Sequence, residues 1–158
     1  MKKEIERKFL VLNDTYKRLG DFEHCIQGYI PSTNKPSIRI RIIGNKSFLT
    51  IKNDISGITR LEYEYELPNQ DAKDLLELFC KKTIIEKNRY EIYYKSTLWE
   101  VDEFLGDNKG LIVAEVELSS EEESYDKPIW IGLEVSINKK YYNYNLAHHP
   151  YKEWDSIG

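Results

Sequence analysis

Charged residues at every second position carry the clearest chemical signal in this 158-residue chain. The chain opens with Glu4-x-Glu6-x-Lys8, and Glu115-x-Glu117 repeats the acidic spacing far along the sequence. Carboxylate oxygens select hard cations such as Mg²⁺ or Mn²⁺. Lysine and arginine side chains, which recur with the same spacing, bind phosphate oxygens. Together they predict a site that holds a short polyphosphate with a divalent metal, where water attacks phosphorus.

A β-hairpin over residues 37–52 predicts how three of the basic side chains lie. The Gly-Asn pair in its middle fits a two-residue primed turn, because both residues tolerate positive φ. The resulting register places Arg41 opposite Phe48. Directly opposed residues point to the same side of a sheet. Arg39, Arg41 and Lys52 therefore share one face, and isoleucine and leucine side chains occupy the other.

The same alternation of charged and apolar residues recurs in segments along the whole chain. Strict alternation indicates antiparallel strands with one buried face. A flat sheet with one charged face satisfies this pattern, but a closed barrel satisfies it better, because closure removes the sheet edges. The sequence therefore predicts an α+β, mainly β fold, in which a closed antiparallel barrel has a charged lumen and helices packed outside.

Three helices are expected to cover the apolar outside of this sheet. Asn69 or Asp71 would cap the first, which has an amphipathic pattern. Ser120-x-x-Glu123 resembles a capping box for a second, short helix. The third is expected over about residues 138–147, and its tyrosines are expected to pack rather than to join the site.

Length, charge and cysteine content limit the class of protein. The 158 residues suit a single domain, residues 1–158, with a real core. A net charge of -4 disfavours nucleic acid as a partner. Cys25 and Cys80 form neither a disulfide framework nor a metal-ligand spacing, and no apolar stretch approaches a membrane span. We expect a cytoplasmic monomer or homodimer without a membrane partner.

The ordered set of charged motifs resembles the CYTH family, the triphosphate tunnel metalloenzymes. The motifs that carry the resemblance are Glu4-x-Glu6-x-Lys8, Arg39-x-Arg41, Lys52, Glu62-x-Glu64, Lys87-x-Arg89 and Glu115-x-Glu117. The resemblance spans Glu4 to about Ala147 and is strongest to the short bacterial branch. It implies an eight-stranded antiparallel tunnel that binds triphosphates with Mg²⁺ or Mn²⁺. Members include inorganic triphosphatases, thiamine triphosphatases and class IV adenylyl cyclases.

The resemblance also implies a role for each charged position. The implied metal ligands are Glu4, Glu6, Asp102, Glu115 and Glu117. The implied phosphate ligands are Lys8, Arg39, Arg41, Lys52, Lys87 and Arg89. The implied catalytic residues are Tyr29, Lys8, Glu62 and Glu64, with the two glutamates near a second metal or the attacking water. Tyr29 is expected either to accept a proton or to orient phosphate or water. Free tyrosine has a pKa of about 10, which Arg39 or Arg41 would lower.

The first functional hypothesis is a divalent-metal-dependent inorganic triphosphatase that releases orthophosphate from tripolyphosphate. The alternatives are a thiamine or nucleoside triphosphatase, a class IV adenylyl cyclase, and a non-catalytic polyphosphate-binding module. Organic substrates need a further pocket, for which the sequence offers no clear feature. Binding alone would need mainly the basic row, whereas the carboxylate set is intact. The acidic net charge disfavours a nucleic-acid-binding barrel.

Overall fold

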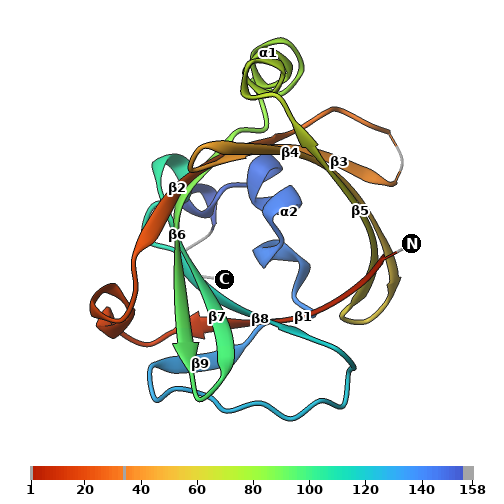
Figure 1. The fold of residues 1–158 in the computed structure, drawn as a ribbon. Coiled ribbons are helices and arrows are strands. Elements are labelled where there is room, and N and C mark those ends of the chain that lie inside the picture. Colours follow the sequence, from red (N-terminus) through yellow and green to blue (C-terminus); the bar gives the residue numbers. More distant parts are fainter. Residues whose placement is uncertain (1, 34, 155–158) are drawn as a thin grey trace.

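A ring of antiparallel strands dominates the computed structural model, which describes residues 2–33 and 35–154 (Figure 1). The strands in these residues are β1 Lys2–Val11, β2 Phe22–Tyr29, β3 Ser37–Ile43, β4 Lys46–Ser56, β5 Thr59–Leu67, β6 Ile85–Tyr94, β7 Thr97–Phe104, β8 Ile112–Leu118 and β9 Ile131–Glu134. The first eight follow one another around the ring in the order β1-β5-β4-β3-β2-β6-β7-β8, and β8 pairs with β1 again. The predicted closed, eight-stranded antiparallel barrel is confirmed, and β9 extends it beside the last residues of β1.

The predicted hairpin register is confirmed between β3 and β4. Arg39 lies opposite Thr50, and Arg41 lies opposite Phe48. Gly44 has a φ of 57° in the turn that joins the two strands, a conformation that favours glycine because it has no Cβ. The turn fixes this register, and the register matters because a slip of one residue would move every side chain of the slipped strand to the other face of the sheet.

The largest apolar core lies outside the ring, as the alternating pattern predicts. Phe9 and Trp99 are fully buried there, and their rings meet edge to face with centroids 5.5 Å apart. Tyr16, Trp130 and Ile131 cover this surface from segments outside the ring. The barrel is therefore stabilised from its outer face, which leaves the lumen free to hold charges.

Helix α1 (Asn69–Phe79) also packs on the outside of the barrel, over β2, β3 and β4 (Figure 1). Its buried residues Ala72 and Leu76 pack with Ile40 of β3. Gly28 permits the close approach, because a Cβ at this position would lie only 2.6 Å from the Cβ of Cys80. The helix begins directly after Pro68, so neither expected residue is its N-cap.

The other two expected helices differ from the prediction. Residues 120–123 form a turn, in which a Glu123 carboxylate oxygen accepts a hydrogen bond from the backbone N–H of Ser119 at 2.6 Å, so the predicted short helix is wrong. The region 138–147 is divided at Tyr142, whose φ of -71° and ψ of 137° are extended. A 3₁₀ turn, η3 (Lys139–Tyr141), precedes this residue, and helix α2 (Asn143–His148) follows it.

Helix α2 lies across one end of the barrel, within the outline of the ring in Figure 1. Its Leu146 is fully buried against Ile85, Phe104 and Val113. Each of these three residues lies an even number of positions from a charged lumen residue on its own strand, so its side chain points into the lumen. We conclude that α2 places an apolar plug inside the barrel, whereas α1 covers its outside.

The remaining helical pieces are single turns. They are η1 Thr15–Arg18, η2 Gly106–Asn108 and η4 Tyr151–Glu153. Within residues 2–33 and 35–154, no helix combines the length and the apolar character that crossing a bilayer requires.

Candidate active site

The lumen contains a cavity of about 560 Å³ that receives side chains from all eight strands of the ring. The predicted site residues that line it are Glu4, Glu6, Lys8, Tyr29, Arg39, Arg41, Lys52, Glu62, Glu64, Lys87, Arg89, Glu115 and Glu117. Asp102 lies behind them and is fully buried. The structure therefore brings together residues that are separated by more than half of the chain.

Acidic and basic residues gather on opposite sides of the ring. Strand β1 carries Glu4 and Glu6, and its neighbours β5 and β8 carry the other acidic pairs. Strand β2 lies directly across the ring from β1. The neighbours of β2 carry the basic pairs, which are Arg39 and Arg41 on β3 and Lys87 and Arg89 on β6. One cavity thus has a positive and a negative side.

Positive charge on the β3 side is incompletely neutralised. The Nη2 atoms of Arg39 and Arg41 lie 3.7 and 3.6 Å from the same carboxylate oxygen of Glu64. Their Nε atoms are buried, and no hydrogen-bond partner for them is found among the described residues. Burial lowers the pKa of Arg41, and the charges of Arg39 and Arg89 lower it further. An anion would satisfy these donors and relieve this repulsion.

The β6 side is organised more tightly, around Asp102. Arg89 donates to its two oxygens from Nε at 2.7 Å and from Nη2 at 2.8 Å. The Nζ of Lys87 donates to the same carboxylate at 2.8 Å. Burial raises the pKa of Asp102, but the attraction of Arg89 and Lys87 lowers it to a greater extent. Direct metal binding by Asp102 would require one of these contacts to break.

Lys8 bridges two carboxylates on the acidic side. Its Nζ lies 2.7 Å from an oxygen of Glu115 and 3.1 Å from an oxygen of Glu6. Burial lowers the pKa of Lys8, but these two charges outweigh it, so the net shift is upward. The Lys8 backbone N–H donates to Ser136 at 3.0 Å, which holds this part of β1 in place. Lys8 therefore carries a full positive charge at neutral pH.

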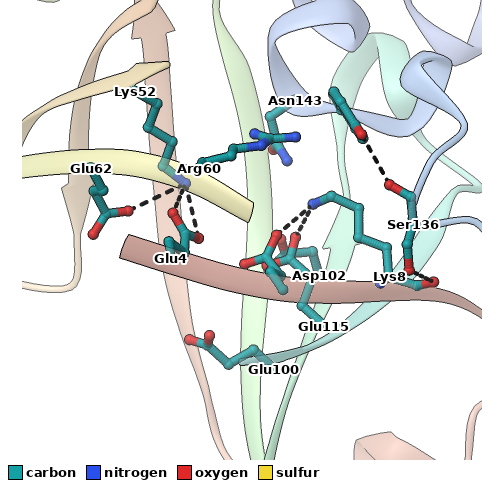
Figure 2. Close-up of polar contacts among 12 residues, drawn as sticks. Glu4, Lys8, Lys52, Arg60, Glu62, Glu100, Asp102, Glu115, Ser136 and Asn143 are labelled. Atoms are coloured by element: carbon teal, nitrogen blue, oxygen red, sulfur yellow. Dashed lines mark hydrogen bonds and ion pairs between the residues drawn. The ribbon is translucent and has the colours of Figure 1, made fainter. Parts of the chain in front are cut away.

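Lys52 forms a second bridge, between Glu4 and Glu62 (Figure 2). Its Nζ lies 2.8 Å from one carboxylate and 3.4 Å from the other. In the part of the chain that the structure describes, no three Asp, Glu, His or Cys side chains are grouped as a metal site. Lysine ammonium groups instead occupy positions between the carboxylates.

Negative charge accumulates around Glu117. Burial raises its pKa, and the nearby charges of Glu4 and Glu6 raise it further. These side chains offer only oxygen ligands, which suit Mg²⁺ or Mn²⁺. The donor chemistry and the repulsion among these carboxylates therefore fit a hard divalent cation.

Tyr29 extends into the same cavity from β2. Its ring packs edge to face on Tyr144 of α2 at a centroid distance of 5.2 Å, and Gln27 Nε2 donates to its hydroxyl at 3.4 Å. Burial raises the pKa of Tyr29 by more than the charges of Arg39 and Lys8 lower it. Arg39 lowers the pKa as expected, but burial makes the net shift upward, so the hydroxyl is protonated at neutral pH.

The cavity also contains side chains that the sequence did not single out. Arg60 lines the cavity from β5. It lies two positions before Glu62, so the alternation of charged residues along this strand could have predicted its place in the lumen. Tyr142 and Tyr144 line it as well, and their assignment to packing alone is wrong. Asn143 accepts a hydrogen bond from Lys87 at 2.9 Å. These last three residues carry no alternating signal because they enter the lumen with the plug.

Comparisons with known proteins agree with this geometry. The model of the CYTH domain matches residues 2–148. An inorganic triphosphatase of Acetivibrio thermocellus is 47% identical over 154 residues, which cover 98% of this chain and 99% of the relative. An inorganic triphosphatase of Nitrosomonas europaea is 34% identical over 151 residues, with 91% and 96% covered. A crystal structure of an inorganic triphosphatase superposes with a TM-score of 0.67 at 32% identity, covering 93% of this chain and 95% of that one. The chain belongs to the CYTH domain family.

Proposed function

We propose that this protein is a divalent-metal-dependent triphosphatase that hydrolyses tripolyphosphate to pyrophosphate and orthophosphate. The observation that carries the proposal is that one cavity has incompletely neutralised positive charge on its β3 side and crowded carboxylates on the opposite side. A polyphosphate satisfies the positive side, and a cation satisfies the negative side. The two relatives that are named inorganic triphosphatases support the same reaction.

The basic residues would bind the phosphate chain. Arg39 and Arg41 have buried Nε donors to offer, and Lys87 and Arg89 are held toward the cavity by Asp102. Guanidinium groups bind phosphate oxygens in pairs, which also orients the chain. Transfer of a phosphoryl group depends chiefly on such positioning and on charge stabilisation.

The carboxylates would hold the metal, with Glu4, Glu6, Glu115 and Glu117 as the ligands that face the cavity and Asp102 behind them. Held there, Mg²⁺ or Mn²⁺ would supply positive charge to phosphate oxygens and would lower the pKa of a water molecule. Lys8 and Lys52 are shared between the two sides. When their ammonium groups turn to phosphate, they release carboxylate oxygens, so binding of the anion and of the cation would reinforce each other.

Glu62 and Glu64 would orient the attacking water. They extend from β5, and Thr50 donates to Glu64 at 2.9 Å, which leaves its other oxygen for water. Tyr29 would donate a hydrogen bond to phosphate, since its hydroxyl is protonated. Cys25 and Cys80 are free and buried, which supports a reducing, cytoplasmic location.

A phosphate-release assay tests the proposed reaction. Tripolyphosphate, ATP, thiamine triphosphate and pyrophosphate would each be supplied with Mg²⁺ or with Mn²⁺. We expect tripolyphosphate to have the highest kcat/KM and pyrophosphate to be a poor substrate. Faster turnover of ATP or thiamine triphosphate would identify an organic triphosphatase, and formation of cyclic AMP would identify a cyclase. Binding without turnover of any of the four would leave a polyphosphate-binding module.

Tyr29→Phe should lower kcat by less than about tenfold, because it removes one hydrogen bond of about 0.5–1.5 kcal/mol. The burial that raises the pKa of Tyr29 disfavours it as a proton acceptor near neutral pH. The pH–rate profile should therefore keep its shape. The measurement is kcat and KM for tripolyphosphate across the pH range, for the variant and the parent. A loss beyond about a hundredfold, with a basic limb missing from the profile, would instead identify a general base.

A further inference from the structure

Arg60 lies in the lumen, but none of the roles proposed above involves it. It lies near the start of β5, opposite Glu4 of β1 and Asp54 of β4. Its side chain is 22% exposed and lines the cavity. Figure 2 shows it extending from β5 into the space between Lys52 and Asn143. Arg60 therefore faces the cavity, as Glu62 and Glu64 do.

The charge of Arg60 reaches residues on two other strands. Burial lowers the pKa of Arg60, but the negative charge of Glu6 and contacts with Tyr142 raise it by more, so the guanidinium remains charged. Arg60 in turn lowers the pKa of Lys8 and opposes the upward shift of Tyr29. Arg60 and Tyr142 also line one recess of the lumen together with Glu4, Glu6 and Lys8.

The contacts of Arg60 are weak enough to be replaced by contacts with a bound anion. Its guanidinium carbon lies 4.3 Å from the centre of the Tyr142 ring, and its Nε lies 3.5 Å from an oxygen of Asp54. Asp54 also pairs with Lys35, so it keeps a cation if Arg60 moves. Arg89, by contrast, is held to Asp102 by hydrogen bonds of 2.7 and 2.8 Å and also donates to Glu100 at 3.1 Å. Stacking leaves the edge of a guanidinium available for an anion.

We propose that Arg60 is a further substrate-binding residue, which leaves Asp54 and binds the phosphate nearest to α2. This inference rests on the proposed function, because it takes tripolyphosphate as the ligand. The Tyr142 ring holds the guanidinium beside the cavity before substrate enters. Arg60 would thus add a cation from β5, on the side of the ring where acidic residues otherwise dominate.

The test compares Arg60→Gln, Arg60→Lys and the parent protein. Arg7→Gln is the matched control, since Arg7 lies on the same barrel but pairs with Glu134 at 2.9 Å, and it does not line the cavity. Tripolyphosphate turnover gives KM and kcat with Mg²⁺. Calorimetry with tripolyphosphate in EDTA gives Kd without turnover, and thermal unfolding shows whether each variant is folded.

Arg60→Gln should raise both KM and Kd by about tenfold or more, the loss typical of a hydrogen bond to a charged group. Its kcat should change by less than its KM. Arg60→Lys should fall between Arg60→Gln and the parent, because it keeps the charge but not the planar fork. Arg7→Gln should match the parent in KM and Kd.

Two results would overturn the inference. One is a KM and Kd for Arg60→Gln within about twofold of the parent values, far below the loss that a charged contact predicts. The other is a lower unfolding temperature for both Arg60 variants with unchanged Kd, which would mean that Arg60 only stabilises the fold. If the parent binds tripolyphosphate through Arg60 but does not hydrolyse it, the proposed function fails and this inference stands. If the parent hydrolyses it and Arg60→Gln binds normally, only this inference fails.

Discussion

EDTA should reduce orthophosphate release from tripolyphosphate to the background rate, and added Mg²⁺ or Mn²⁺ should restore it. The physical reason is the crowding of Glu4, Glu6 and Glu117, whose mutual repulsion contributes to the raised pKa of Glu117. A phosphate chain would bring more negative charge to these carboxylates. The measurement is initial rate against total metal concentration, with a series of chelator concentrations.

The control for this experiment is thermal unfolding in EDTA. The main apolar cluster, around Phe9 and Trp99, lies outside the lumen and contains no proposed ligand. The fold should therefore survive chelation with little change in Tm. Full turnover in excess EDTA would exclude an essential metal. Loss of activity together with unfolding would instead assign the metal a structural role.

Glu115→Gln should remove most of the activity and also destabilise the protein. Burial and Glu6 raise the pKa of Glu115, but the attraction of Lys8 and Arg89 lowers it by more. The ionised form therefore stabilises the folded state above the ordinary carboxyl pKa, and this contribution is lost as pH falls through the lower, folded pKa. Gln cannot carry the charge and leaves Lys8 less compensated. Removing one partner of a buried ion pair costs up to about 3–5 kcal/mol of stability. The loss should be smaller here, because Glu6 would still compensate part of the charge of Lys8.

Glu117→Gln is the matched comparison, because it should remove most of the activity and yet stabilise the free protein. The pKa of Glu117 is raised, so the ionised form opposes folding. The contribution of protonated Glu117 to the stability of the parent is fully present below the ordinary carboxyl pKa and is lost as pH rises through the higher, folded pKa. Gln resembles the protonated acid, so the variant should exceed the parent in Tm at neutral pH, and the difference should vanish in acid.

Two measurements decide this pair of predictions. Rates at limiting metal should fall for both variants, and near-normal rates would show that neither residue binds metal. Denaturant unfolding of the parent and of both variants would be measured at pH 7 and at pH 4. At pH 7, the unfolding midpoints of the two variants should differ from that of the parent in opposite directions. A common shift of both variants would contradict the opposite charge environments described for Glu115 and Glu117.

Local patterns explain why the barrel could be predicted. Alternation within each strand specifies a face, and the Gly44 turn specifies a register, so Arg39, Arg41 and Lys52 were placed correctly from sequence. Helix α2 could not be placed in this way. It is only six residues long, and its position depends on Leu146 meeting Ile85 and other residues from distant strands. Such long-range contacts produce no periodic pattern in the sequence.

The site shows the same limit. Strand parity brought nearly all of the predicted residues to one cavity, but it does not say which residues meet across the lumen. The bridge from Lys8 to Glu115 follows from the pairing of β1 with β8. The raised pKa of Tyr29 follows from burial, which α2 contributes to through Tyr144. Arg60 had the right parity and was missed because no motif marked it.

The pairing of β1 has a consequence for how the chain reaches its folded state. Its residues lie opposite Arg60, Glu115 and Glu134, all of which come much later in the sequence. Pairings of such high contact order form slowly, and unpaired strand edges are prone to aggregate meanwhile. Charged side chains on an open edge discourage association with other chains. The acidic and basic residues of β1 would thus also discourage aggregation of this strand during biosynthesis, until its partner strands have been made.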